Sequence, residues 1–572
     1  MSNATQNSQI TPVAKVARSV SRFVRTSIKP IVFKLSRKLS VTYWPGRRRT
    51  ISGMLLALLA GFVPGLAGAA PTGAVVVAGT VTVLKPSSST TLINQTSPNA
   101  ILNWQSFSIG AGEAVRFVQP SASAVALNRV IGSDPSRIFG ALTANGKVIL
   151  VNNAGVYFAP GASVDVGGLV ASSMSISNAS FLSGKYQFEA GAQSGAVANY
   201  GQLRGAFVVL AAPQVTNAGS IVTSGGATAL AAGGRVSLDI VGDKLVILSV
   251  DAATANAAVQ NSGSISADGG KVFMSASSAN AVLDTVINTS GIVRATSITE
   301  RHGQIVIDGG VAGVVEVSGT LAASGAGAGL KGGAVSVLGD KVALRNGARI
   351  DVSGDTGGGT ALVGGDLHGA GGVKTAAFAL VDAGAVINAD ALANGDGGKV
   401  VVWADQHTGF AGAISARGGA QGGDGGFVET SGKATLAFAG RVDTTAARGA
   451  TGSLLLDPSN ITIRNADSTG GPFAGSTFGS AAATSTLNVD DLTSALASNN
   501  VIVDATVGAA STGSIVVNDN VAWNSDKSLT LKADGTSPTT PRSTAMAAAR
   551  STCMAMARSL PARCRAQAAR SI

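Results

Sequence analysis

The sequence predicts an all-β protein built as a parallel β-helix, and three observations support this fold class. The first is a glycine followed two residues later by a branched apolar residue, a pattern that recurs along the body of the chain. Its positions are Gly219, Gly263, Gly291, Gly319, Gly347, Gly384, Gly412 and Gly440, with spacings of 44, 28, 28, 28, 37, 28 and 28 residues. At Gly347 the apolar residue slips by one position. A near-constant period of this length is typical of solenoids, in which each repeat stacks on its neighbours.

The second observation is a set of glycine turns, each followed by a short run that mostly alternates between apolar and polar residues. These turns begin at Gly233, Gly269, Gly332, Gly397 and Gly425. Such alternation indicates strands with one buried face. The third observation is that no helical period of useful length interrupts the strands, which argues against a βαβ sheet. An antiparallel sandwich or barrel stays open, because one sequence does not show strand direction. A disordered Gly/Ala tract is disfavoured by the regular alternation and the frequent valine.

The composition suits thin, layered β-structure rather than a thick core. The 572 residues include 75 glycines and only 4% aromatic residues, while 45% are apolar. Both cysteines, Cys553 and Cys564, lie near the C-terminal end. Disulfides and thiolate metal sites are therefore not expected in the body. Strand ladders and stacked side chains must hold it together.

The formal net charge of +11 is concentrated at the two ends of the chain. Residues 1–50 hold 11 basic residues and no acidic one, and residues 541–572 hold six arginines and no acidic residue. Residues 51–540 hold 25 basic against 31 acidic residues. This mildly acidic body has no evident basic cluster to neutralise phosphates, so we expect no nucleic-acid partner.

Residues 1–69 are predicted to be a long basic leader that ends in a signal peptide. Arg47-Arg48-Arg49 precede an apolar stretch over 54–66, which is followed by the small-residue pattern at 67–69. The stretch is too short to span a membrane comfortably. We expect cleavage after Ala69, because a cut after Ala70 would leave Pro71 next to the scissile bond. Export would then begin at the Sec machinery. A later translation start is the alternative explanation of the long leader.

The residues that could carry chemistry do not assemble into a recognisable site. "GAGLKG", with Gly327, Gly329 and Gly332, matches a dinucleotide fingerprint, but a strand-like run follows it where pyrophosphate binding needs a helix. Asp396 lies in a segment that faintly resembles a calcium-binding repeat but is not repeated in tandem.

Three histidines, His302, His368 and His407, lie far apart and without neighbouring ligands at metal spacing. The carboxylates are scattered, and no pair of them stands out for acid–base work. We therefore expect no enzyme activity, no cofactor and no metal. A β-helical polysaccharide-acting enzyme is the rival class, although fold alone does not imply function.

Residues 100–174 strongly resemble the N-terminal secretion domain of the filamentous haemagglutinin family, exoproteins of two-partner secretion in Gram-negative bacteria. The matching positions include asparagines, aromatic residues and glycines that come before or inside strand-like runs. They are Asn103, Trp104, Phe107, Gly110, Asn128, Arg129, Asn145, Gly146, Asn152, Gly155, Phe158, Gly161, Gly167 and Gly168. The segments "GGKVVVWADQHTGFAGAISARGGAQGGDGGFVETSGKA" and "GSLLLDPSNITI" also resemble the region after the secretion domain in such adhesins.

The resemblance implies a right-handed β-helix with capping and extra-helical strands at its N-terminus. It places the secretion domain at 70–330 and continued β-helical repeats at 331–535. It also implies a dedicated outer-membrane β-barrel transporter as partner. The unfolded chain would cross the periplasm, be bound at its N-terminal domain and fold outside the cell.

The secreted or cell-surface product would be an adhesin with a host or cell-surface receptor. The alternative is the N-terminal part of a secreted haemolysin or contact-dependent toxin stalk.

Two segments depart from the pattern. The family has Asn-Pro-Asn-Gly where this chain has Asn152-Asn153-Ala154-Gly155. Asn152 and Gly155 are nevertheless expected at one corner of a coil and Pro160-Gly161 at the next, because asparagine and glycine favour turns. After about residue 535 the strand pattern stops, and 536–572 is predicted to be a frameshifted or disordered basic tail, with a basic peptide arm as the alternative.

Overall fold

The computed structural model describes residues 70–241, 244–279, 285–299, 301–468, 484–506, 513–533 and 554–556. The predicted leader and most of the predicted tail, with both cysteines, lie outside these residues. Within the described residues no helix is long and apolar enough to cross a membrane.

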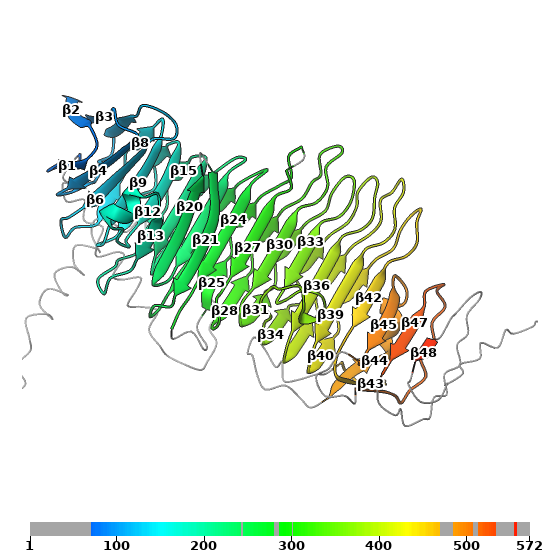
Figure 1. Ribbon diagram of the computed structural model, residues 1–572. Helices are drawn as coiled ribbons and strands as arrows, with labels where there is room; N and C mark the ends of the chain where they lie inside the picture. The colour runs from blue at the N-terminus through cyan, green and yellow to red at the C-terminus, as the bar shows by residue number, and fades with distance from the viewer. Residues whose placement is uncertain are drawn as a thin grey trace, which may run out of the picture. The chain divides into compact units, whose positions relative to one another are not determined.

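The described chain is a parallel β-helix in which each coil adds a strand to up to three long sheets (Figure 1). Sheet 1 contains β1 (Val75–Ala78), β4 (Asn99–Trp104), β6 (Val125–Val130), β9 (Lys147–Asn152), β12 (Gly168–Ser172), β16 (Phe207–Ala212), β19 (Ala227–Ala232), β24 (Lys271–Ala276), β27 (Gln304–Asp308), β30 (Ala334–Leu338), β33 (Thr360–Val363), β36 (Lys399–Ala404), β39 (Phe427–Gly432), β42 (Ser453–Leu456), β45 (Asn500–Asp504), β47 (Leu529–Lys532) and β48 (Met554–Met556). Strand β48 is the only described part of the predicted tail.

Sheets 2 and 3 complete the coils. Sheet 2 contains β7 (Ser136–Ile138), β10 (Val156–Phe158), β14 (Val197–Asn199), β17 (Gln214–Asn217), β22 (Ala258–Asn261), β25 (Thr285–Thr289), β28 (Val314–Val317), β31 (Lys341–Leu344), β34 (Phe378–Val381), β37 (His407–Phe410) and β40 (Thr435–Phe438). Sheet 3 contains β2 (Val81–Ser87), β3 (Thr90–Gln95), β5 (Ala114–Val118), β8 (Ala141–Ala144), β11 (Ser163–Asp165), β15 (Gln202–Arg204), β18 (Ser220–Val222), β23 (Ser264–Ser266), β26 (Ile292–Arg294), β29 (Thr320–Ala322), β32 (Arg349–Asp351), β35 (Val386–Asn388), β38 (Ala413–Ser415) and β41 (Arg441–Asp443).

Pairing in these sheets is parallel, except that β1 pairs antiparallel with β4 and β2 pairs antiparallel with β3 at the N-terminal end. The parallel β-helix prediction is therefore confirmed, and the antiparallel sandwich or barrel is excluded. The expected capping strands are present. The remaining elements lie outside the three sheets. They are the antiparallel sheet of β13 (Tyr186–Glu189), β20 (Arg235–Val241) and β21 (Lys244–Ala252), the parallel sheet of β43 (Asn460–Arg464), β44 (Ser485–Asn488) and β46 (Ser514–Val517), helices α4 (Asn178–Leu182) and α5 (Val489–Ala495), and the 3-10 turn η1 (Leu367–Gly369).

The glycine register marks one corner of successive coils, because each of the eight glycines precedes a strand of sheet 3. Glycine is required there by close approach. A Cβ on Gly263 would lie 2.2 Å from the Gly219 carbonyl oxygen, and one on Gly291 would lie 2.1 Å from the Gly263 carbonyl oxygen. At both Gly347 and Gly384 the corner holds one extra residue, so the buried residue is Ile350 or Ile387, three positions after the glycine. The register read at Gly384 was therefore wrong by one position.

The two long spacings are insertions that leave the coil. The 44-residue interval contains the hairpin of β20 and β21, and the 37-residue interval contains residues 364–377 between β33 and β34. The alternating run after Gly233 is a strand with one buried face, as predicted, but it forms β20 of the extra-helical sheet and not a strand of the coils. A period of two is the same in both settings, so the pattern could not separate them.

The core is a set of aliphatic ladders that run through the coils. The central residues of the sheet 3 strands pair in register from one coil to the next and are at most 5% exposed. They are Leu142, Val164, Leu203, Ile221, Ile265, Val293, Leu321, Ile350, Ile387, Ile414 and Val442. A buried polar ladder runs beside them, with side-chain hydrogen bonds from Asn199 to Asn217 (2.8 Å), from Asn217 to Asn261 (2.8 Å) and from Asn261 to Thr289 (3.1 Å).

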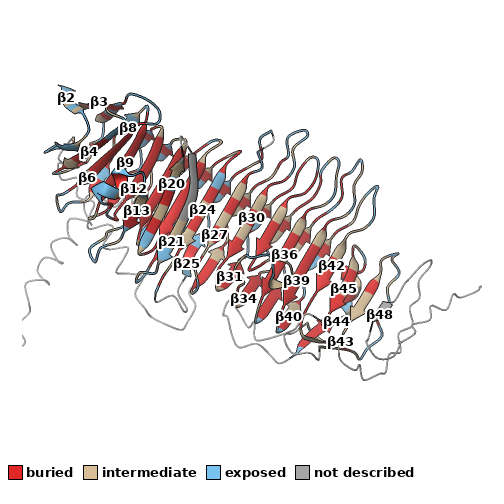
Figure 2. Ribbon diagram, viewed as in Figure 1, coloured by how far each residue is buried: buried red, intermediate tan, exposed pale blue. Residues whose placement is uncertain are grey.

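Segments outside the coil cover the outer face of sheet 1 in two places. Strands β9, β12, β16 and β19 are buried along their whole length, because α4 and the sheet of β13, β20 and β21 pack against their outer side. Strands β24, β27 and β30 alternate between buried and more exposed residues (Figure 2). Strands β36 and β39 are again almost fully buried, where the 364–377 segment lies against them.

Candidate functional site

The residues matched to the secretion domain lie in the first coils, and several hold adjacent coils together. Trp104 on β4 is fully buried, and its Nε1 donates a hydrogen bond to Oδ1 of Asn128 on β6 at 3.0 Å. A buried indole N–H needs such an acceptor. Phe107 packs edge-on against Trp104, with ring centroids 5.4 Å apart.

Arg129 joins the first coils to the segment that leads into α4. Its guanidinium donates to Oδ1 of Asn103 at 3.4 Å and to the carbonyl oxygen of Ile176 at 2.8 Å. Burial lowers the pKa of Arg129. Through these two contacts Arg129 connects the first coils to the segment that leads into α4.

The Asn145–Gly146 pair forms a corner around Gln119. Oδ1 of Asn145 accepts from the backbone N–H of Gln119 at 2.8 Å, and Nδ2 of Asn145 donates to the carbonyl oxygen of Gln119 at 2.8 Å. The N–H of Gly146 donates to Oε1 of Gln119 at 3.1 Å. A Cβ on Gly146 would lie 2.8 Å from the backbone carbonyl oxygen of Ala124, so glycine is needed here.

The turn that departs from the family pattern forms as expected. The N–H of Gly155 donates to the carbonyl oxygen of Asn152 at 2.8 Å, and the N–H of Ala154 donates to Oδ1 of Asn152 at 3.0 Å. Nδ2 of Asn152 also donates to the carbonyl oxygen of Asp134 at 2.9 Å. Asn153, where the family has proline, donates from Nδ2 to Oγ of Ser175 at 2.9 Å.

The remaining matched positions are also packed or at corners. Phe158 is fully buried. Gly161 has φ +91 at the predicted second corner, and a Cβ on Gly168 would lie 2.5 Å from the Phe207 ring. Gly167 approaches the carbonyl oxygen of Gly146, and the N–H of Gly110 donates to the carboxylate of Glu113. The matched residues thus mainly build the first coils, and among them only Asn145 and Gly161 are exposed.

Of the two residues expected at the signal cleavage site, Ala69 lies outside the described residues and Ala70 is the first of them. The backbone of Ala70 has φ +63, a left-handed conformation that costs an L-residue about 1–2 kcal/mol. Its N–H donates to Oε2 of Glu113 at 2.8 Å, the same oxygen that accepts from Gly110.

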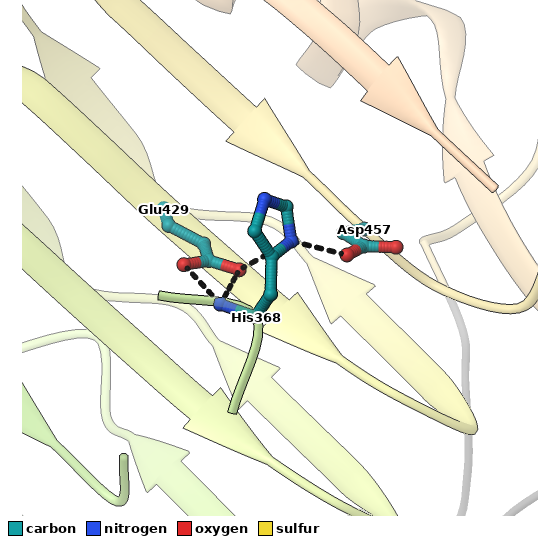
Figure 3. A group of neighbouring side chains, drawn as sticks. All are labelled: His368, Glu429 and Asp457. Atoms are coloured by element: carbon teal, nitrogen blue, oxygen red, sulfur yellow. Dashed lines mark hydrogen bonds and ion pairs between the residues drawn. The ribbon is translucent and has the colours of Figure 1, made fainter. Parts of the chain in front are cut away.

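A second group, missed by sequence reasoning, lies far along the coils. His368 of η1, Glu429 of β39 and Asp457, just after β42, meet on the outer side of sheet 1 (Figure 3). Nδ1 of His368 lies 2.9 Å from Oδ2 of Asp457 and 3.9 Å from Oε1 of Glu429. Among the described residues this is the one group of three such side chains close enough to share a metal ion.

The sequence shows no ligands at metal spacing around His368, whereas the structure places two carboxyl groups beside it. Its partners lie 61 and 89 residues away in the sequence, and they meet it only where the 364–377 segment folds onto the stacked coils. Glu429 and Asp457 are one 28-residue period apart, the one sequence signal that places them on adjacent coils.

The two carboxyl groups in this cluster are unusual in their burial. The Glu429 side chain is 0% exposed and that of Asp457 is 3% exposed. Burial raises the pKa of Glu429 to about 7, opposed by the nearby His368 imidazole. Burial likewise raises the pKa of Asp457 to about 6, against the hydrogen bond from His368.

Comparison with known proteins identifies the first coils. The profile of the TPS secretion domain family, where TPS stands for two-partner secretion, matches residues 67–323. The crystal structure of the HMW1 secretion domain from Haemophilus influenzae is similar over 68% of this chain and 100% of that one, with a TM-score of 0.58 and 30% sequence identity.

Two proteins of Haemophilus influenzae described as heme/hemopexin-binding protein are also similar. One is 30% identical over 253 residues, covering 40% of this chain and 27% of that protein. The other, from strain ATCC 51907 / DSM 11121 / KW20 / Rd, is 32% identical over 267 residues, covering 45% of this chain and 29% of that protein. The matched part thus spans less than a third of the length of these relatives.

Proposed function

We propose that this chain is an exoprotein secreted through a cognate outer-membrane transporter, and that it acts as an adhesin at the cell surface. It belongs to the proteins that carry a TPS secretion domain, which supports the first part of this proposal. The observation that supports adhesion is the repeated outer surface of sheet 3. Register-matched side chains are stacked there coil after coil, as in the run Ser264, Ile292 and Thr320. A repeated surface can make many weak, similar contacts with a receptor at once, and such contacts add to avidity.

The proposal is tested by binding to host cells. We expect the full secreted chain to bind cells, and a fragment that ends at residue 330 to bind several-fold less, because fewer coils contribute. Equal binding by both would place the activity in the secretion domain and contradict the proposal. Binding by neither would exclude adhesion through the described coils.

A second candidate is binding of heme or hemopexin, because the two relatives named above are described as heme/hemopexin-binding protein. The same preparations are therefore presented to immobilised hemopexin with and without haem. Binding there without binding to cells would favour this second function over adhesion.

Export is tested by producing the chain in a Gram-negative host with and without its transporter. We expect the chain in the medium only when the transporter is present. An Asn128→Ala variant leaves the buried Trp104 indole N–H without its acceptor, so its export should fall if the transporter needs correctly formed first coils. Equal amounts in the medium with and without the transporter would contradict dependence on that partner.

We also propose Sec-dependent entry into the periplasm and cleavage of the signal peptide after Ala69. That cut turns the Ala70 nitrogen into an ammonium group 2.8 Å from a Glu113 oxygen, which would form a charge-assisted pair. It also removes the preceding carbonyl and with it the cost of the left-handed φ. Mass spectrometry of the secreted chain should find Ala70 as its first residue, and a start at Pro71 would contradict this assignment.

A further inference from the structure

We propose that His368, Glu429 and Asp457 bind a divalent transition cation of the zinc class, which fastens the 364–377 segment to the outer face of sheet 1 (Figure 3). The proposal concerns the coils after the secretion domain and does not depend on the adhesin function. It rests on the arrangement and burial of these three side chains.

The donor atoms lie near the separations that such an ion requires. In a tetrahedral zinc site with bonds of about 2.0–2.1 Å, ligand atoms are about 3.3 Å apart. The His368 Nδ1 distances to the two carboxylate oxygens, 2.9 and 3.9 Å, fall on either side of this value, and all three donor atoms lie within 4.8 Å of one another. One imidazole nitrogen and two carboxylate oxygens form a donor set that zinc accepts. The His368 side chain is 33% exposed, so water can fill a fourth position.

The charges in the cluster also call for a cation. Two almost fully buried carboxylates face one imidazole, and a buried negative charge is costly unless it is compensated. Two lysines of the neighbouring segments already have carboxylates of their own. Lys399 pairs with Asp366 of the covering segment, and Lys532 lies 3.1 Å from Asp504. A divalent ion would neutralise both carboxylates of the cluster.

The surroundings hold the ligands in place. The Glu429 carboxylate accepts from the backbone N–H of His368 at 3.2 and 3.3 Å, so the loop and β39 are already in contact. The backbone N–H of Asp457 donates to Oγ of Ser431 at 3.1 Å. Such outer hydrogen bonds orient metal ligands and raise affinity.

The site would form only when the coils have stacked. Because 89 residues separate His368 from Asp457, an unfolded chain in transit does not present the three ligands together. The cation would therefore bind after export and stabilise the folded coils by mass action.

The test uses the full mature chain without a histidine tag, treated with EDTA and dialysed. We expect one equivalent of Co²⁺ to bind with the visible absorption of a tetrahedral site, Zn²⁺ to displace it, and the melting temperature to rise with Zn²⁺. His368→Ala, Glu429→Gln and Asp457→Asn each remove or weaken a ligand, so each should reduce affinity by more than the about 10–100-fold that loss of an outer hydrogen-bond partner typically costs. His302→Ala, at an exposed histidine elsewhere in the coils, is the matched control and should bind as the original chain does.

The proposal is overturned if no Co²⁺ binds, if its spectrum is octahedral and unchanged by the three substitutions, or if His302→Ala weakens binding equally. Far-UV circular dichroism checks folding of each variant. His368 lies on a partly exposed turn outside the coil, so His368→Ala keeps the test decisive even if a carboxylate variant misfolds. Cell binding is measured separately, so failure of the adhesin proposal and failure of the metal site are distinguishable.

Discussion

The two covered regions of sheet 1 have opposite chemistry. Near the N-terminus, α4 and the sheet of β13, β20 and β21 cover an apolar surface, where buried Phe181, Phe188 and Val236 pack on Ile149 and Val209. Farther along, the 364–377 segment covers Trp403 on β36, but it also covers the carboxylates of Glu429 and Asp457. The first cover is held mainly by apolar contact, whereas the second contains buried charge.

The first cover therefore stabilises the fold by itself, whereas the second requires something to offset the cost of its buried charge. Fully burying a side chain such as phenylalanine contributes about 1.5–3 kcal/mol, so the first cover is stable without a ligand. The second gains from Trp403 but bears the cost of two buried carboxylates. A ligand that neutralises charge would change the second cover and leave the first unchanged.

The largest effect on stability is expected from a substitution that disrupts the apolar cover near the N-terminus. Phe188→Ala removes a fully buried ring between the extra-helical sheet and the coils, and we expect a loss of about 3–5 kcal/mol. Hydrogen exchange of β16 and β19 should report it, because long repeat arrays need not unfold in one step. Leu182→Ala, at an exposed position on α4, is the control and should change stability by no more than about 0.5 kcal/mol. Equal protection in the two variants would mean that the cover contributes little.

A smaller effect on stability is expected in the coils between the two covers. No segment covers sheet 1 there, and polar side chains form hydrogen bonds between adjacent coils. Asp268 accepts hydrogen bonds from Thr296 (2.7 Å) and Arg294 (2.7 Å) of the next coil and from Ser266 (3.0 Å). Burial alone would raise the pKa of Asp268, but these hydrogen bonds outweigh it and lower the pKa below its usual 3.8. Asp268→Asn should cost about 1–2 kcal/mol at neutral pH.

The pH dependence of this tie follows from the direction of the shift. A lowered pKa means that the carboxylate stabilises the folded state above its ordinary pKa, and that this stabilisation is lost as the pH falls through the folded pKa, below about 3.8. Denaturation of the original chain should therefore show an acid-induced loss that is smaller in Asp268→Asn. Asp165→Asn, at an exposed position of β11, is the control. The same acid profile in Asp268→Asn and the original chain would contradict the role given to this carboxylate.

The comparison also shows what a sequence can predict in such a fold. The corners at Gly263 and Gly291 were predictable because a carbonyl oxygen of the preceding coil leaves no room for a Cβ, so glycine recurs at the coil period. Strand β20 was predictable as a strand with one buried face, but not its place outside the coils, because alternation is the same in a coil and in a hairpin. The His368 cluster could not be predicted from the sequence, because contact between coils depends on the lengths of the loops between them. In the sequence, the two irregular spacings of the glycine register indicated where segments of the two covers leave the coils.

The smallest effect on stability is expected at the turn of residues 152–155, at the edge of the apolar cover. The double substitution Asn153→Pro and Ala154→Asn restores the family's Asn-Pro-Asn-Gly turn. Proline is favoured at the second position of a turn closed by the Asn152 carbonyl oxygen and the Gly155 N–H, and it can add about 0.4–1 kcal/mol by restricting the unfolded chain. The substitution also removes the hydrogen bond from Asn153 to Ser175 at 2.9 Å, worth about 0.5–1.5 kcal/mol.

These two contributions nearly cancel, so the double variant should unfold within about 0.5 kcal/mol of the original chain. Asn153→Ala, which loses the hydrogen bond and gains no proline, is the matched control and should be the less stable of the two. If the turn serves only to form the coil, export through the transporter will be the same in all three proteins. A several-fold rise in export with unchanged stability would show instead that the transporter reads this turn directly, since neither folding nor the cover would have changed.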